Sequence, residues 1–259
     1  MADMANSEQV AQCWDALTAA GVADKTIPVT YMNSSAAIKS FTGEHGGTIC
    51  TSSNAQKSLE WAFAKSEKVL FMPDQHLGRN TAVLSLGLSL EDCVLWNPWK
   101  PMGGLTETEI KNAKVILWRG HCSVHGRFTL ESVNEIRERV QGVQVLVHPE
   151  CQHDVVSASD VVGSTEKIIQ TVSNSPAGSK WAIGTELNLV SRLAKTNPDK
   201  EIYFLDKAVC YCSTMNRIDL PHLVWALESL VAGKIVNQIS VDPETARYSK
   251  LALEQMLAL

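Results

Sequence analysis

The feature that most constrains the fold of this chain is a repeated alternation of short apolar runs and helical patterns. In the first half these runs are TIPVTYMN (26–33), GTICTSSNA (47–55), KVLFMPD (68–74) and KVILWRGHC (114–122). Apolar strands without polar alternation, joined by helices, are typical of a parallel sheet covered on both faces. The first half therefore predicts an αβα unit with a short four-stranded parallel sheet.

The second half has the same plan. Its runs are VQVLVHPEC (143–151), ASDVVGSTEKII (158–169), KWAIGTELNLVSRLA (180–194) and EIYFLDKAVCYC (201–212). Because internal repetition indicates repeated structural units, we expect an α/β fold of pseudo-symmetric αβα domains, each with a four-stranded parallel sheet. The predicted ranges are 1–122, which includes a preceding linking helix, and 123–259, which ends in C-terminal helices. The stretch CVLWNPWKPMGGL (93–105) reads as a structured loop before the last strand of the first half.

Polar residues stand at the ends of the predicted strands, at equivalent places in both halves. They are Tyr31, Asn33, Thr51, Ser52 and Ser53 in the first half, and His148, Glu150, Ser164 and Thr165 in the second. Ligands of parallel α/β units bind at the carboxyl ends of the strands. We therefore expect these side chains to line a binding site.

The residues alone leave two interpretations open for each of these groups. The hydroxyls at the strand-to-helix turns are either N-caps or part of anion sites, which helix N-termini favour. The pair His148 and Glu150 is either a polar strand terminus or an acid–base pair. Tyr31 is either a buried aromatic residue with a satisfied hydroxyl or a residue of the site.

Two of the seven cysteines stand at equivalent positions. Cys122 and Cys212 each come after the fourth predicted strand of a half, and each lies seven residues before a predicted helix N-cap, Thr129 or Asp219. The number of cysteines is odd and their spacing irregular, so buried packing or metal ligation is favoured over disulfides.

The first predicted helix, which Asn6 or Ser7 caps, has the same character as the two helices that come after the cysteines. Counting back seven residues from its cap leads to a position just before Met1. The pattern therefore predicts a third cysteine of the same kind upstream of Met1.

Charge and hydropathy exclude several classes of protein. The net charge is −5 and no basic run is present, which argues against a nucleic-acid partner. No apolar stretch reaches the roughly 18–20 residues of a membrane span. The opening MADMANSEQV lacks the basic and apolar regions of a signal peptide. We therefore expect a cytoplasmic protein that binds neither membranes nor nucleic acid.

Seven motifs together resemble the quinolinate synthase family in order and spacing. They are VTYMNSSAAIK, TSSNA, PDQHLGRNTA, GHCSVHGRFT, HPEC, GSTEKII and CSTMNRIDL. The resemblance covers nearly the whole chain. It implies three pseudo-symmetric αβα domains that each contribute one cysteine to a central [4Fe–4S] cluster. The chain would then contain the second and third domains and lack the first.

The resemblance implies that Cys122 and Cys212 are cluster ligands, the latter in the family pattern C-x-x-M with Met215, and that the third cysteine ligand lies upstream of Met1. Three thiolates leave one iron open to act as a Lewis acid. Cys210 is interpreted as a neighbour without a ligand role. The remaining cysteines are expected to be structural: Cys13, Cys50, Cys93 and Cys151.

The resemblance also implies roles for the polar residues. Tyr31, His148 and Glu150 would be catalytic acid–base groups that also contact the substrate, with Asn33 beside Tyr31. Ser52, Ser164 and Thr165 would hold carboxylate or phosphate groups. For the other motif residues, we expect a minor site role for His125 and no site role for His121. We expect Asp74 and Asn80 to organise a strand-to-helix turn, and Arg79 to face solvent.

The implied reaction condenses iminoaspartate with dihydroxyacetone phosphate to form quinolinate in de novo NAD biosynthesis, a transferase activity. Because iminoaspartate is unstable in water, an aspartate-oxidising enzyme is the implied functional partner. The alternative is a truncated, non-catalytic homologue that binds anions without a stable cluster, which the missing third cysteine favours. We expect the 259-residue chain alone to be inactive.

Overall fold

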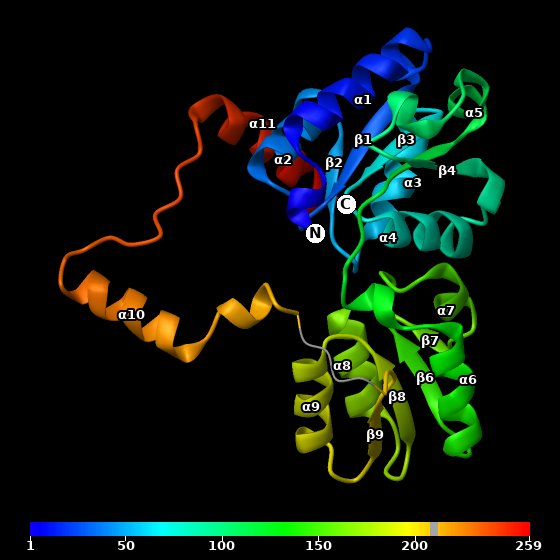
Figure 1. Ribbon diagram of the computed structural model, residues 1–259, viewed down its shortest axis with the longest axis vertical. Coiled ribbons are helices and arrows are strands. Elements are labelled where there is room, and N and C mark those ends of the chain that lie inside the picture. Colours follow the sequence, from blue (N-terminus) through cyan, green and yellow to red (C-terminus); the bar gives the residue numbers. More distant parts are fainter. Residues whose placement is uncertain (208–211) are drawn as a thin grey trace.

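The computed structural model of this chain describes residues 1–207 and 212–259. Two α/β units lie one above the other, joined near residue 120 (Figure 1). Cys210 falls outside the described residues. In the described ranges, no helix is both long and apolar enough to cross a bilayer.

The first unit is built on a parallel sheet of order β2-β1-β3-β5-β4. Its strands are β1 (Thr26–Tyr31), β2 (Thr48–Cys50), β3 (Lys68–Met72), β4 (Cys93–Trp96) and β5 (Val115–Trp118). Its helices are α1 (Ser7–Ala19), α2 (Ala36–Glu44), α3 (Ala55–Lys65), α4 (Gln75–Asn80) and α5 (Glu107–Asn112). The four predicted strands are confirmed.

Two predictions for the first unit were wrong because of β4. The sheet was expected to have four strands, and residues 93–105 were expected to form a loop throughout. Cys93–Trp96 pairs in parallel with β5, which makes a five-stranded sheet. This apolar tetrapeptide lies at the sheet edge, where Cys93, Val94 and Leu95 are only half-buried. The turn-forming residues after it, from Asn97 to Gly104, favoured a loop over the whole stretch.

The second unit contains the predicted four-stranded parallel sheet, of order β7-β6-β8-β9. Its strands are β6 (Gln144–Val147), β7 (Val161–Val162), β8 (Lys180–Gly184) and β9 (Glu201–Phe204). Its helices are α6 (Leu130–Arg139), α7 (His153–Ser157), α8 (Thr165–Asn174) and α9 (Leu187–Thr196). The α/β class with repeated αβα units is confirmed.

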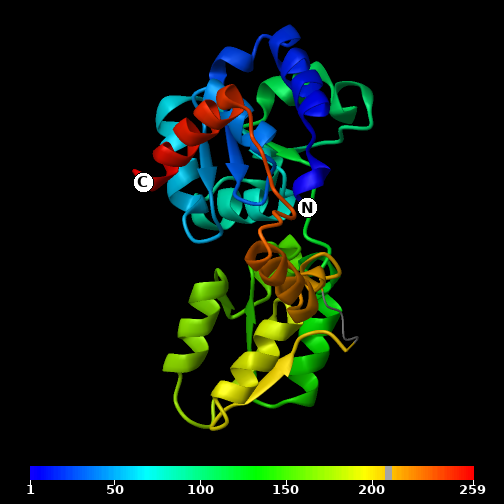
Figure 2. The ribbon, with the colours of Figure 1, turned by 90° about the vertical axis from the view of Figure 1, so that its left-hand side faces the viewer.

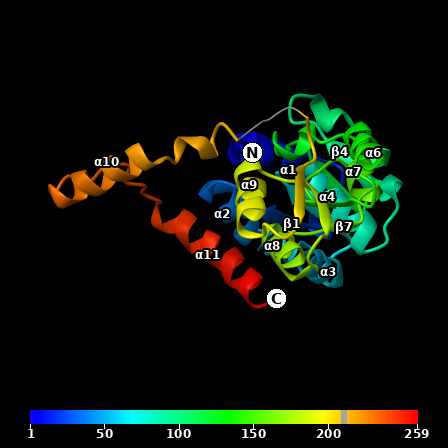
Figure 3. The ribbon, with the colours of Figure 1, turned by 90° about the horizontal axis from the view of Figure 1, so that it is seen from below.

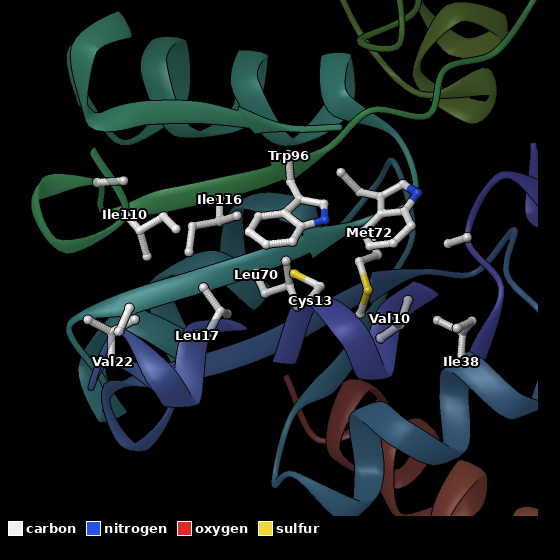
Figure 4. Packing of buried hydrophobic residues seen from close by; sticks show 14 residues of the cluster. Val10, Cys13, Leu17, Val22, Ile38, Leu70, Met72, Trp96, Ile110 and Ile116 are labelled. Atoms are coloured by element: carbon white, nitrogen blue, oxygen red, sulfur yellow. The ribbon is translucent and has the colours of Figure 1, made fainter. Parts of the chain in front are cut away.

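Helix α1 covers one face of the first sheet. Val10, Cys13 and Leu17 recur at helical spacing and are fully buried against Leu70 and Ile116 of the sheet, as Figure 4 shows. The burial of Cys13 confirms its structural role. The opposite face of the sheet packs against α3, and against Leu77 of α4.

Helix α6 covers the second sheet in the corresponding way. Val133 and Ile136 pack against Val145 and Val147 of β6. The other face of this sheet is covered by apolar residues of α8 and α9. In each unit, therefore, one face is covered by a helix that precedes the first strand of that unit.

The C-terminal segment leaves the second unit. Helix α10 (Leu220–Val231) stands away from both units in Figures 1 and 3, and none of its residues is buried. Helix α11 (Pro243–Leu257) then packs on α2 and β2 of the first unit. The boundary between 1–122 and 123–259 stays a prediction, since the last helix of the second range contacts the first unit.

Gly43 lets α11 approach α2 closely. A Cβ at this position would overlap the backbone carbonyl of Tyr248 in α11. In an isolated helix, Gly→Ala stabilises by about 1 kcal/mol. We expect Gly43→Ala to have the opposite sign, with a loss of about 1–3 kcal/mol in urea unfolding because of the overlap. Glu44→Ala, at the exposed neighbouring position, should be close to neutral. A stabilised Gly43→Ala variant would contradict the close packing.

Candidate active site

The carboxyl ends of the two sheets face each other across the junction of the units (Figures 1 and 2). Tyr31 closes β1 of the first unit, and His148 and Glu150 come after β6 of the second. The Tyr31 hydroxyl donates a hydrogen bond to the Glu150 carboxylate, so this contact joins the two units. The three predicted catalytic residues therefore lie together, and all three are buried.

His125 lies at the centre of this group, although the sequence suggested only a minor site role. Its Nδ1 is 2.8 Å from Glu150 Oε2 and its Nε2 is 3.2 Å from the Thr185 hydroxyl. Its ring stacks on that of His148, with centroids 4.4 Å apart. The side chain of Thr185 is buried directly after β8, at the same sheet edge as His148.

The charges of this buried group are set by its hydrogen bonds. Burial alone would lower the pKa of His125, but hydrogen bonds with Cys122 and Glu150 raise it to about 10. Burial would raise the pKa of Glu150, but the hydrogen bond and the charge of His125 hold it below its ordinary value. At neutral pH the pair is therefore an imidazolium and a carboxylate.

The neighbouring groups stay neutral for related reasons. Burial, and next the charge of His125, lower the pKa of His148 to about 3. Burial, and next the charge of Glu150, raise the pKa of Tyr31 above its ordinary value. The site thus combines one buried carboxylate with a protonated phenol and a neutral imidazole, which are groups that can exchange protons with a substrate.

Cys122 lies beside this group in the loop after β5. Its backbone N–H donates to Asp74 Oδ2 over 3.0 Å, and its thiol is hydrogen-bonded with His125. Ligand atoms of Cys122, His125 and Glu150 lie within 4.8 Å of one another, so the three could hold a metal ion. Asp74 also accepts from the N–H groups of His76 and Leu77, which confirms that it organises the turn into α4.

The turn after Cys122 recurs after Cys212. The carbonyl of Cys122 accepts from Gly126 N–H, and that of Cys212 accepts from Asn216 N–H, each over 2.9 Å. Each turn continues as a short 3-10 helix, η6 (His125–Arg127) or η7 (Met215–Arg217). Among the described residues, Cys212 is not part of the possible metal site of Cys122.

Each 3-10 helix leads into an N-capped helix. The predicted caps are confirmed, with Thr129 accepting from the N–H of Ser132 and Asp219 from that of His222. The N-terminal segment has the same order of elements, with η1 (Ala2–Met4) before α1 and its cap Asn6. The spacing between 3-10 helix and cap is the same in all three places.

The predicted anion-binding residues lie in different environments. The Ser52 hydroxyl is hydrogen-bonded to Tyr31, and Ser52 lines a cleft of about 340 Å³ together with Pro149 and Gly163. Ser52 does not cap α3, because Asn54 holds that position. Ser164 caps α8 by accepting from the N–H of Lys167, as simple capping predicts.

The remaining predicted residues lie further out. Thr165 begins α8 and is exposed, and so is Asn33 in the loop after β1. Arg79, which was expected to face solvent, is half-buried. Asn80 does not organise the turn of its own unit. Its amide contacts the second unit instead, which corrects the expectation.

Comparison with known proteins identifies the family. The family model described as "Quinolinate synthetase A protein" matches residues 1–258. This chain belongs to that family. The resemblance seen in the seven motifs is thereby confirmed.

Similar curated proteins carry the name quinolinate synthase. Those of Streptomyces coelicolor, Nocardioides sp. and Corynebacterium glutamicum are 70%, 65% and 54% identical to this chain. Each match covers 100% of this chain and 66%, 67% and 66% of the respective relative. The chain thus spans about two thirds of the length of these relatives.

The hydrogen bond between Thr185 and His125 can be tested by measuring the free energy of unfolding of variants. Thr185→Val should destabilise the fold by about 1–3 kcal/mol, because it leaves a buried ring nitrogen without its partner. Thr30→Val is the matched control, since the Thr30 hydroxyl is also buried but has no hydrogen-bond partner among the described residues. It should be neutral or stabilising in urea unfolding. Equal losses in the two variants would contradict a role of Thr185 in holding His125.

Proposed function

We propose that the protein to which this chain belongs is a quinolinate synthase. It condenses iminoaspartate with dihydroxyacetone phosphate, with loss of phosphate and water, to form quinolinate for NAD biosynthesis. The observation that carries the proposal is the family match over residues 1–258, joined to the buried acid–base group at the junction of the two sheets. Because iminoaspartate is unstable in water, an aspartate-oxidising enzyme would supply it.

The condensation and dehydration steps need groups that take and return protons. Glu150 is a buried carboxylate that accepts a hydrogen bond from the Tyr31 phenol, so the pair can act as base and acid on the same substrate. His148 Nδ1 accepts from the Glu150 backbone N–H over 3.4 Å. A neutral His148 therefore carries its proton on Nε2, from which it can donate to a substrate oxygen.

Both substrates carry anionic groups, which need donors at the edge of the acid–base group. Ser52 lines the cleft between the units, and Ser164 caps α8 beside Gly163 of the same cleft. Free N–H groups at the N-terminus of α8 favour an anion there. We propose that Asn33, Ser52, Ser164 and Thr165 contact the carboxylate or phosphate groups.

The residues present fit a cysteine-bound iron–sulfur cluster. Cys122 and Cys212 are both half-buried, lie on turns of the same form, and offer the thiolate ligands that such clusters require. Cys122 and Cys212 would hold the cluster together with a third ligand from outside the residues of this chain. A [4Fe–4S] cluster with three protein ligands supplies an open iron that acts as a Lewis acid.

The exposure of helix α10 supports the proposal that the whole protein contains a further αβα unit. The helices α1 and α6, which come after the corresponding turns, each cover a sheet. Helix α10 comes after the turn at Cys212, yet Leu223, Leu227 and Leu230 are each more than half exposed. We propose that α10 covers the sheet of a third unit, in the way that α1 and α6 cover theirs.

The acid–base role of Glu150 is tested in the full-length protein. Glu150→Gln should lower quinolinate formation roughly 10²-fold or more, the usual scale for a general acid or base, and should leave cluster absorbance intact. Glu131→Gln, at an exposed position of α6, should behave as wild type. Near-normal turnover by Glu150→Gln would remove Glu150 from the mechanism.

The ligand assignment is tested by anaerobic reconstitution of the same protein. Cys122→Ser and Cys212→Ser should each abolish the visible absorbance of the cluster, because each removes a thiolate. Cys210→Ser and Cys151→Ser should retain it, and Cys151 is a matched control since it is buried near Cys122 with its thiol directed to the Gly184 carbonyl. Normal iron and sulfide in Cys212→Ser would refute its ligand role. Absence of a cluster in the wild type would favour the non-catalytic alternative.

A further inference from the structure

The motif PDQHLGRN, residues 73–80, has no part in the proposed chemistry, yet both of its ends contact the site. It forms α4 and the turn before it. At the N-terminal end, Asp74 accepts from the backbone N–H of Cys122. At the C-terminal end, the buried amide of Asn80 reaches the loop that carries Glu150. One short helix thus lies between the proposed cluster ligand and the catalytic carboxylate.

All three hydrogen bonds of the Asn80 side chain cross to the second unit. Its Nδ2 donates to the carbonyl oxygens of Pro149 and Cys151, over 2.8 and 2.9 Å. Its Oδ1 lies 2.9 Å from His153 Nδ1. The residue is only 3% exposed, so its side chain is bonded to protein in a buried place. Both N–H donors of the amide and its oxygen are therefore bonded at the contact of α4 with α7.

The two carbonyls that Asn80 holds belong to the residues immediately before and after Glu150. Binding both of them fixes the backbone of Glu150 relative to the first unit. Tyr31, which donates to the Glu150 carboxylate, belongs to that first unit. The distance between phenol and carboxylate is thus controlled by the same inter-unit contact. Few side chains could replace Asn80, because aspartate has no N–H donor and glutamine is one methylene longer.

We propose that Asn80 is a positioning residue, which clamps the Pro149–Cys151 loop to the first unit and so holds Glu150 opposite Tyr31. The proposal rests on the proposed function where it concerns turnover. Its structural part, the clamp itself, does not depend on the reaction.

The test compares Asn80→Asp and Asn80→Ala with Asn197→Asp in the full-length protein. Asn197 is a matched control, since it is 7% exposed and its Nδ2 also donates to a carbonyl, that of Leu193, over 2.9 Å. It lies at the C-terminal end of α9, where the chain turns toward the start of β9 and away from the site. All three changes should lower stability.

Amide hydrogen exchange reads out the clamp directly. The N–H groups of Glu150 and Cys151 donate to His148 within this loop, and the N–H of His148 donates to the Gly184 carbonyl of β8. In both Asn80 variants these N–H groups should exchange at least about tenfold faster than the loss of global stability alone would cause. In Asn197→Asp their exchange rate should change only as much as the loss of global stability requires. Loop exchange that tracks global stability in all three variants would overturn the proposal.

Turnover gives the second readout. Asn80→Asp and Asn80→Ala should lower kcat for quinolinate formation about 10–100-fold with cluster absorbance unchanged, the scale of lost outer-shell contacts. Asn197→Asp should keep wild-type kcat. A wild-type kcat in both Asn80 variants would overturn the positioning role. If the wild-type protein forms no quinolinate, the proposed function fails, and the exchange measurement still decides whether Asn80 is a clamp.

Discussion

The structure of the site depends on one buried ion pair, between the imidazolium of His125 and the carboxylate of Glu150 at 2.8 Å. A buried charge is tolerated only when it is paired and hydrogen-bonded. Thr185 and Cys122 hold His125, while Tyr31 donates to Glu150 from the other unit. The first unit therefore adds partners to an ion pair formed within the second unit, and this pair keeps a carboxylate ionised in a buried site.

The repeated architecture explains why this ion pair lies where it does. Parallel strands bring their polar ends to one edge of a sheet, and the two sheets turn these edges toward each other. After Cys122 the chain passes through a tight turn and a capped helix, which covers the sheet of the second unit. The same turn therefore places a thiol at the junction and starts the core of the next unit.

Local sequence pattern was sufficient to predict most of the fold. Runs of apolar residues located eight of the nine strands in the described part of the chain, and cap residues such as Thr129 and Asp219 located helix starts. The edge strand β4 was missed because its apolar run is short and leads into turn-forming residues. The roles of His125 and Asn80 were underestimated, because their partners are distant in sequence and no periodicity encodes such contacts. Thr185 could have been found, since it comes directly after a predicted strand, at the same sheet edge as His148.

The charge of His125 tests the buried ion pair most directly, by ¹⁵N NMR of the imidazole in the cluster-free full-length protein. With its pKa near 10, both ring nitrogens should remain protonated at pH 8, where an ordinary histidine is neutral. In Glu150→Gln the pKa of His125 should fall a large part of the way back, because the side chain at position 150 no longer carries a negative charge. A neutral His125 ring at pH 8 in the wild-type protein would contradict the buried ion pair.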